Sequence, residues 1–544
     1  MPARIGGGCA QEDLMALARR RLSSFKNNER GNALPLMAAA VFPIFASIGA
    51  GVDIARAHMT EAKLQEAVDS AALAGRRAMS GNDIATARSD AQAYLGFNFP
   101  AGYNGTTPVI STVTSPSTGT VRVTAETRMP TTFMKLFGYD EQKISVSSEA
   151  TQNFENIDIV LVLDTTGSMD ENAGNNKTRI QALRAAVREF YKELEPSQTA
   201  LANQGLRMRF GIVPYSTSVN VGKLLRSKST SYIQSSGLEY YQWRDTDSRA
   251  NRESWSFGKQ TRDFSSYLNN TPLSSINGHN YGVGKRWTGC IEERKTIATI
   301  TATDQRAGPP SGALDLNIDL IPTSDTNTKW KPYFLDPKNA YKVVNNQIVW
   351  TQDPNQGCPT QATPLGTMNA TSIGTAVDAL VPDGNTYLDI GMIWGTRMIS
   401  SGGVFGIDNP ATWRDRPVRK YIIFMTDGYM NTPRDMCFDR NCTTDYDHTM
   451  AYSAYGIERF DARVGGTSDN DNRERHLKRF LMACNEARAR QISVWTIAFA
   501  EGDTDELKAC ASNADQFAFA ADTNALIAKF KEIGKNIGPL RLSK

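Results

Sequence analysis

The sequence predicts an α/β protein in which one transmembrane helix, a helical stalk and a small β-rich region precede a parallel sheet covered by helices. Three observations predict this organisation. Residues 31–52 carry no charge, residues 107–152 are dense in Val, Thr and Ser, and short apolar runs alternate with amphipathic stretches after Glu155. A chain of 544 residues is also too long for one ordinary core, so we expect more than one folded unit.

Residues 31–52 form the predicted transmembrane helix. As a helix, these 22 residues extend about 33 Å, which is enough to cross a hydrocarbon layer of about 30 Å. Basic residues crowd its N-terminal flank: Arg19, Arg20, Arg21, Lys26 and Arg30. The positive-inside rule therefore predicts cytosolic residues 1–30 and export of the rest. A cleaved signal peptide is the alternative, although the apolar run is long for one and no clear A-x-A site follows.

Residues 53–153 are predicted to form the helical stalk and the small β unit. From Asp53 to about Phe97 the chain is rich in alanine, with apolar residues at helical spacing and no proline. Such a small-residue face lets another helix approach closely, although packing within the chain would leave the same pattern. Residues 107–152, with Pro-Ser-Thr-Gly as a turn, are typical of short β-strands.

Residues 154–540 are predicted to form a doubly wound α/β domain. The nearly all-apolar run 157–163 is typical of a strand that is covered on both faces. Further strands are expected at 209–216, 419–428, 492–500 and 516–521, and helices from about Ile180 and at 386–400, 472–490, 503–512 and 523–537.

The stretch from about 219 to 384 has no sustained periodicity and is predicted to be a large inserted subdomain with its own packing. We expect its tryptophans to form a core, with a ligand-facing role, for instance toward a glycan, as the alternative. These residues are Trp243, Trp255, Trp287, Trp330 and Trp350.

Oxygen-bearing side chains follow the predicted strands at the edge of the sheet where ligands bind in open α/β folds. Asp164, Thr166 and Ser168 follow the first strand in "DTTGSMD". A second apolar strand ends "FMTDG", which places Asp427 at the same edge of the sheet, and Thr386 lies just before a helix. Hard oxygen donors suit Mg²⁺, with Mn²⁺ or Ca²⁺ as alternatives, and suit zinc poorly. The competing interpretation is that Asp164 and Thr386 only form turns or cap helices.

Six of the seven cysteines lie in the second half of the chain, an even number that suits three disulfides in an oxidising compartment. Of the 15 pairings that six cysteines permit, we expect the following three. Cys484 and Cys510 lie on the helices that precede and follow the strand at 492–500 and can pair if these helices share a face of the sheet. Cys437–Cys442 would close a short loop, and Cys290–Cys358 would close the insertion. Unpaired buried thiols are the alternative.

Several functions are disfavoured by composition and motifs. With 60 basic and 57 acidic residues, the charge gives no case for nucleic acid binding. Neither "NNKT" nor "GVGKRW" completes a phosphate loop, so we expect no nucleotide. The usual hydrolase motifs are missing, and the four histidines, His58, His279, His448 and His476, are expected at the surface. We therefore expect no enzyme, and metal-dependent hydrolysis is the least favoured function.

The three loops resemble the metal-ion-dependent adhesion site (MIDAS) of von Willebrand factor type A domains, whose fold is a Rossmann-like α/β sandwich. The first loop matches through Asp164, Thr166 and Ser168, the second through Thr386 and the third through Asp427, with Thr166 in place of the commoner serine. The resemblance covers about 155–218 and 384–540. It implies a metal whose coordination shell the protein leaves incomplete and a protein partner that donates an acidic side chain.

Residues 29–75 resemble the N-terminal segment of TadE/TadG-like proteins of the tight-adherence (Flp) pilus system. With the A-type domain, this implies a TadG-like protein of the bacterial envelope that serves pilus assembly or adhesion. Counted from Gly31, Leu36 stands where processed pilins carry glutamate, so we expect a permanent anchor. The implied protein spans the inner membrane once, with most of the chain periplasmic or surface-exposed. A structural scaffold that uses no metal is the alternative.

Overall fold

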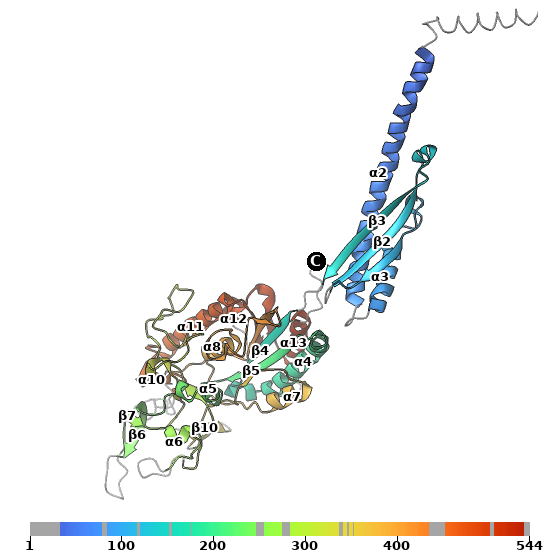
Figure 1. The fold of residues 1–544 in the computed structure, drawn as a ribbon. Helices are drawn as coiled ribbons and strands as arrows, with labels where there is room; N and C mark the ends of the chain where they lie inside the picture. The colour runs from blue at the N-terminus through green and yellow to red at the C-terminus, as the bar shows by residue number, and fades with distance from the viewer. Residues whose placement is uncertain are drawn as a thin grey trace, which may run out of the picture. The chain divides into compact units, whose positions relative to one another are not determined.

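The computed structural model divides the chain into two compact units, Met1–Asn153 and Phe154–Lys544 (Figure 1). The described residues are 33–78, 84–116, 120–151, 155–174, 176–245, 255–274, 283–336, 341–344, 347–351, 353–434, 452–500 and 505–537.

The first unit combines two helices with a three-stranded antiparallel sheet of order β1-β2-β3. Its elements are α2 (Ala33–Ala78), α3 (Ile84–Asn98), β1 (Val109–Thr114), β2 (Thr120–Pro130) and β3 (Glu141–Thr151). Among the described residues, one helical stretch, Ala39–Ala78, is long and apolar enough to cross a membrane, with a mean hydropathy of 1.4 in its best window.

The alanine-rich segment differs from the predicted continuous stalk. Helix α2 ends at Ala78, and α3 packs back against it, with Ala71, Ala72, Ala87 and Ala91 buried in one core with the sheet. Small side chains allow this close approach of two helices. The small-residue face therefore packs within the chain.

The second unit is built on a sheet of order β12-β5-β4-β14-β17-β18, with β13 paired to β14. Strands β5, β4, β14, β17 and β18 are parallel, and β12 and β13 are antiparallel to their neighbours. The strands are β4 (Asn156–Asp164), β5 (Met208–Tyr215), β12 (Thr363–Gly366), β13 (Thr412–Trp413), β14 (Arg416–Thr426), β17 (Ile492–Phe499) and β18 (Phe517–Ala520). The predicted α/β class is confirmed.

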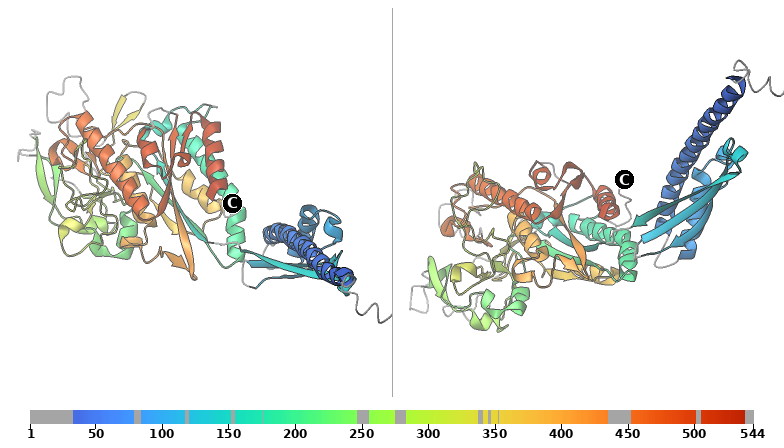
Figure 2. Two further views of the ribbon diagram at one scale, coloured as in Figure 1. Left: turned by 90° about the horizontal axis from the view of Figure 1, so that it is seen from above. Right: turned by 45° about the horizontal axis from the view of Figure 1, so that its top comes forward.

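Helices cover both faces of this sheet (Figure 2). On β4, Val160 and Val162 enter one core, whereas Ile159, Leu161 and Leu163 enter the other. This alternation explains why the strand is apolar throughout. The first core contains α8 (Leu388–Ile399), α11 (Asp469–Ala489) and α12 (Asp505–Cys510), and the second contains α4 (Arg179–Asn203), α7 (Ala370–Asp378) and α13 (Thr523–Ile537).

The segment between β5 and β12 contains a series of short elements. They are α5 (Gly222–Lys228), β6 (Leu238–Asp245), β7 (Trp255–Arg262), α6 (Ser265–Leu268), β8 (Ile291–Glu292), β9 (Lys331–Pro332), β10 (Tyr341–Val344) and β11 (Gln347–Trp350). The chain rejoins the main sheet at Thr363, before the predicted end of the insertion near 384.

The inserted segment shares its main core with the sheet. Among the described residues, Trp287 and Trp330 are buried in the same core as Val160, and a smaller cluster around Cys290, Tyr333 and Leu335 packs separately. A segment this rich in polar residues and glycine needs the apolar face of the sheet to complete a core. The side chains of Trp243, Trp255 and Trp350 lie outside the described ones.

Two of the three predicted disulfides are present. Cys290 joins Cys358 within the inserted segment, with Cα atoms 5.8 Å apart, and Cys484 on α11 joins Cys510 on α12, with Cα atoms 5.2 Å apart. Cys437 and Cys442 lie outside the described residues.

Candidate functional site

Three loops meet at the carboxyl ends of β4 and β14. The two strands are parallel neighbours, with Leu163 opposite Met425, so the loops that follow them start at one edge of the sheet. The loop before α8 joins them through its backbone. The Gly167 N–H donates to the Gly384 carbonyl at 3.0 Å, and Thr386 and Asn431 exchange two backbone hydrogen bonds of 3.1 and 3.0 Å. The three predicted loops are therefore brought together.

The side chains predicted from the first and third loops form a chain of short oxygen contacts. Ser168 Oγ lies 2.9 Å from Thr166 Oγ1 and donates to Asp427 Oδ1 at 2.8 Å. Asp164 Oδ1 accepts the Thr166 backbone N–H at 2.8 Å. Asp164, Thr166 and Asp427 are buried, and Ser168 is half-buried. Ser168 therefore marks the side of this oxygen cluster that faces solvent.

Thr386 lies in the second loop, 5% exposed, and is held there by the backbone bonds to Asn431. Gly384, two residues before Thr386, has a φ of +83°. A Cβ atom at this position would lie 3.0 Å from Thr217 Oγ1. Both the backbone conformation and the close approach favour glycine at this position. The second loop is thus shaped to sit tightly against the end of β5.

The inserted segment supports the second loop from the other side. Asp383 Oδ2 accepts the Gly357 backbone N–H at 3.0 Å and Gln356 Nε2 at 2.6 Å. Gly357 directly precedes Cys358, which is bonded to Cys290. The disulfide therefore anchors the turn that holds the start of the second loop.

The electrostatics of the cluster are dominated by two buried carboxylates. Burial raises the pKa of Asp164, and burial together with the charge of Asp164 raises the pKa of Asp427 to about 7. Arg179, at the start of α4, donates to Asp427 Oδ2 at 3.1 Å and pairs with Glu171 at 3.0 Å. Within the described part of the chain, the hydrogen bonds that Asp164 accepts come from neutral groups.

Three supporting residues were missed by sequence reasoning. Thr426 Oγ1 donates to Asp164 Oδ2 at 2.7 Å, and the Tyr215 hydroxyl lies 3.5 Å from the same oxygen. Neither follows from a motif, because their proximity depends on the strand order. Arg179 did offer a signal. A cation in the first turn of a helix opposes the helix dipole, and so it indicates a nearby carboxylate.

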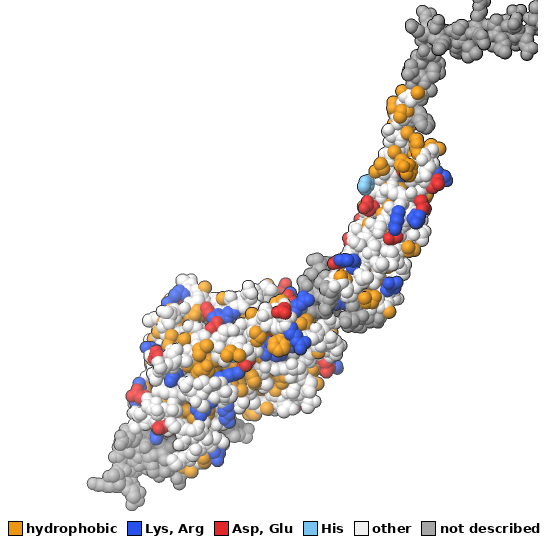
Figure 3. Space-filling model, in the orientation of Figure 1, with side chains coloured by type: hydrophobic (Ala, Val, Ile, Leu, Met, Phe, Trp, Pro, Cys, Tyr) orange, Lys and Arg blue, Asp and Glu red, His pale blue; other side chains and the backbone are white. Residues whose placement is uncertain are grey.

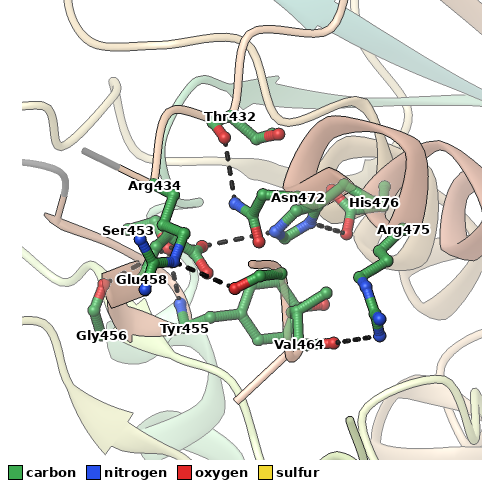
Figure 4. A network of polar contacts seen from close by, with 12 residues as sticks. Thr432, Arg434, Ser453, Tyr455, Gly456, Glu458, Val464, Asn472, Arg475 and His476 are labelled. Carbon is green, nitrogen blue, oxygen red and sulfur yellow. Dashed lines mark hydrogen bonds and ion pairs between the residues drawn. The ribbon is translucent and has the colours of Figure 1, made fainter. Parts of the chain in front are cut away.

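A buried ionic network contacts the second and third loops, and Figure 4 shows the part of it around His476, Glu458 and Asn472. His476 on α11 contacts Asp389 of α8 at 2.8 Å and Glu458 at 3.3 Å, and its ring packs edge-on against Tyr387, next to Thr386. Asn472, one turn earlier, donates to the Thr432 carbonyl at 3.0 Å. The network therefore fixes both loops from beneath.

His476 corrects the prediction that all four histidines lie at the surface, because its side chain is fully buried. Burial alone would lower the pKa of His476, but Asp389 and Glu458 raise it to about 10. Sequence reasoning missed this because the two acids come from distant segments of the chain.

Comparison with known families identifies the N-terminal part of the chain. Residues 31–93 match the family model described as putative Flp pilus-assembly TadE/G-like. This match confirms the resemblance that the sequence predicted for that segment. No curated protein matches the chain.

Solved structures with similarity to the chain include three pilus proteins. The pilus adhesin SpaC from Lactobacillus rhamnosus GG is 14% identical, with 78% of this chain and 34% of that chain covered and a TM-score of 0.31. The vWF domain of the type V pili tip protein Mfa5 from Porphyromonas gingivalis is 13% identical, with 72% of this chain and 98% of that chain covered and a TM-score of 0.30. The PilB minor pilin from Streptococcus sanguinis is 11% identical, with 80% of this chain and 78% of that chain covered and a TM-score of 0.32. The chain spans about a third of the SpaC structure.

Proposed function

We propose that the chain is a membrane-anchored factor of a Flp-type pilus system that binds a protein partner through a divalent cation, with Mg²⁺ as the first choice. The pilus assignment rests on the TadE/G-like match over residues 31–93, and the anchor rests on the apolar part of α2. In this proposal α2 crosses the bacterial inner membrane once and the second unit is exported. The binding function rests on the oxygen cluster of the second unit.

The residue set fits a hard cation. Asp164, Thr166, Ser168 and Asp427 offer carboxylate and hydroxyl oxygens, which are the ligands that Mg²⁺ prefers, and Thr386 adds a hydroxyl from the adjoining loop. Burial raises the pKa of Asp164 and of Asp427, and of these two Arg179 faces only Asp427 among the described residues, so the pair of carboxylates has one cation between them. A bound cation would supply further positive charge and a vacant coordination position for an acidic side chain of the partner.

One observation carries the proposal. Hydrogen-bond contacts connect Thr166, Ser168 and Asp427 at the carboxyl ends of β4 and β14, and Ser168 is the half-buried member on the solvent side. An approaching acidic group would therefore reach the cluster from the Ser168 side.

Photocrosslinking in living cells tests the proposal. A benzophenone amino acid replaces Asp170, which is exposed and lies two residues after Ser168, and a control places it at the half-exposed Lys529 on α13. We expect a protein adduct specific to position 170 that EDTA and the Asp164→Asn variant both abolish. An adduct that persists unchanged in EDTA contradicts the metal-dependent mechanism.

A second candidate function is a structural scaffold that uses no metal, and Arg179 favours it. Its guanidinium already supplies a positive charge to Asp427. In a scaffold, Arg179→Met would lower the free energy of unfolding by about 3–5 kcal/mol, because a buried carboxylate loses its partner, and Mg²⁺ would not restore it. In a cation site, Mg²⁺ would recover much of that loss. Thermal unfolding of the variant with Mg²⁺ and with EDTA separates the two.

A further inference from the structure

The loop that joins β2 to β3 in the first unit, residues 131–140, is unusually apolar for an exposed turn. Its sequence is "TTFMKLFGYD", and four large side chains are exposed. Their exposed fractions are 80% for Leu136, 62% for Tyr139, 45% for Phe137 and 41% for Phe133. A cluster of this kind normally marks a surface that binds an apolar partner.

Asp53 fixes this loop to α2. Its carboxylate is 1% exposed and accepts the backbone N–H groups of Thr132, Phe133 and Met134 at 2.9, 2.7 and 2.8 Å. Arg56 adds a hydrogen bond to Thr132 Oγ1 at 2.6 Å. The first charge after the apolar segment is therefore satisfied by the loop rather than by water. Such an arrangement suits a carboxylate at the edge of a membrane, where water is scarce.

The loop also extends past Asp53 toward the apolar segment. A side chain on Gly49 would meet Phe133 Cβ at 2.6 Å, so Phe133 lies directly on the helix backbone there. Gly49 precedes Asp53 by about 6 Å along the helix axis. Elements that lie in a membrane interface bury their apolar side by about 5–10 Å, which matches this offset.

Helix α2 offers apolar side chains at the same level. Phe45, Ile48 and Val52 are 68%, 60% and 43% exposed, and Figure 3 shows exposed hydrophobic side chains along this part of the first unit. The composition of the loop fits an interface as well, because aromatic rings gather at the level of the headgroups and Lys135 can reach lipid phosphates.

We propose that residues 131–140 insert their apolar side chains into the leaflet from which α2 emerges at Asp53. The loop then makes a second, lateral contact with the bilayer and holds the first unit at a fixed angle to the membrane. This inference rests on the membrane anchor of the proposed function, and it is independent of the cation site.

The test uses the full chain in vesicles of phosphatidylethanolamine and phosphatidylglycerol. A benzophenone amino acid replaces Leu136, and matched proteins carry it at Leu73, an exposed leucine farther along α2, or at Phe45. Leu73 lies about 30 Å beyond Asp53 along the helix. After irradiation, mass spectrometry measures lipid adducts. We expect adducts at Phe45 and Leu136 that exceed those at Leu73 by about tenfold, since only the first two positions lie in the bilayer.

Labelling at Phe45 without labelling of Leu136 above the Leu73 level overturns the inference and leaves the anchor standing. A protein adduct in place of lipid at Leu136 also overturns it. Absence of lipid adducts at Phe45 rejects the anchor itself, and the inference falls with it.

Discussion

Two of the buried clusters of charged residues in the second unit differ in their balance of charge. In the network beneath the loops, Asp315 pairs with Arg479, Glu293 pairs with Arg397 at 2.9 Å, and Asp389 and Glu458 both face His476. In the oxygen cluster at the rim, Asp164 accepts hydrogen bonds from neutral groups and Asp427 faces Arg179.

The difference separates a structural role from a binding role. Buried carboxylates that each face a cation hold segments of the chain in place, here the inserted segment against α8 and α11. Carboxylates with raised pKa values beside a half-buried hydroxyl retain capacity for a further positive charge. Removal of one partner from the first cluster is therefore expected to destabilise the protein, whereas the second cluster is expected to bind a cation.

The largest effect is expected in the network. Arg479→Met leaves Asp315 buried without its guanidinium partner, so the free energy of unfolding should fall by about 3–5 kcal/mol. Urea unfolding of the full chain measures this change. A loss below about 1 kcal/mol, the range of an exposed pair, would show that the network is not structural.

The same substitution should have opposite effects in the two clusters. Asp389→Asn weakens the contact with His476 and should destabilise the protein by about 2 kcal/mol. Asp164→Asn removes a buried negative charge whose hydrogen-bond donors among the described residues are neutral, and in EDTA it should be neutral or stabilising by about 1 kcal/mol. Denaturation of both variants in EDTA provides the comparison. Equal destabilisation would remove the distinction between the clusters.

The pH dependence of stability should report on His476. Its pKa is raised from 6.5 to about 10, so its stabilising contribution is complete below about pH 6.5 and is lost as the pH rises toward 10. Asp389, Glu458, Tyr387 and Tyr455 contact the His476 ring. Arg479 is the nearby cation, with its Nε 3.8 Å from Asp389 Oδ2. The free energy of unfolding should fall by about 1–3 kcal/mol between about pH 7 and pH 9.

His476→Gln is the control for this pH dependence. The variant should be less stable at neutral pH, and its stability should change less over the same interval, because the titrating group is gone. A slope that stays the same in the variant would assign the pH effect to other groups.

The smallest effect is expected at the surface. Lys529→Met breaks an exposed pair with Glu532 on α13, a contact of 3.0 Å, and should change stability by less than about 0.5 kcal/mol. This variant calibrates the unfolding measurements on the two buried clusters.

Sequence patterns predicted the elements that depend on local periodicity. The apolar run 157–163 lies within β4, and predicted helix 523–537 coincides with α13, because burial on both faces or on one face leaves a direct mark on the sequence. The end of the insertion was harder to predict. Strand β12 contains only Thr363–Gly366 at the edge of the sheet, and so short a strand has no detectable alternation.

Some residues of the candidate site were also predictable from the sequence, and others were not. Asp164 and Asp427 were predicted because each lies at the carboxyl end of a predicted strand, and parallel strands bring these ends together. Arg179 and His476 were not predicted, because their partners come from segments that only the folded chain brings close. Pairing of buried charges is a property of three-dimensional packing and leaves no periodic signal.

The central claim is that the oxygen cluster at the rim binds a divalent cation. Electron paramagnetic resonance of Mn²⁺ added to the full chain counts bound ions directly, with the Asp164→Asn variant as the control. We predict one Mn²⁺ per wild-type chain, displaced by Mg²⁺, and loss of that site in the variant. Absence of bound Mn²⁺ in the wild type, or equal binding by both proteins, would contradict it.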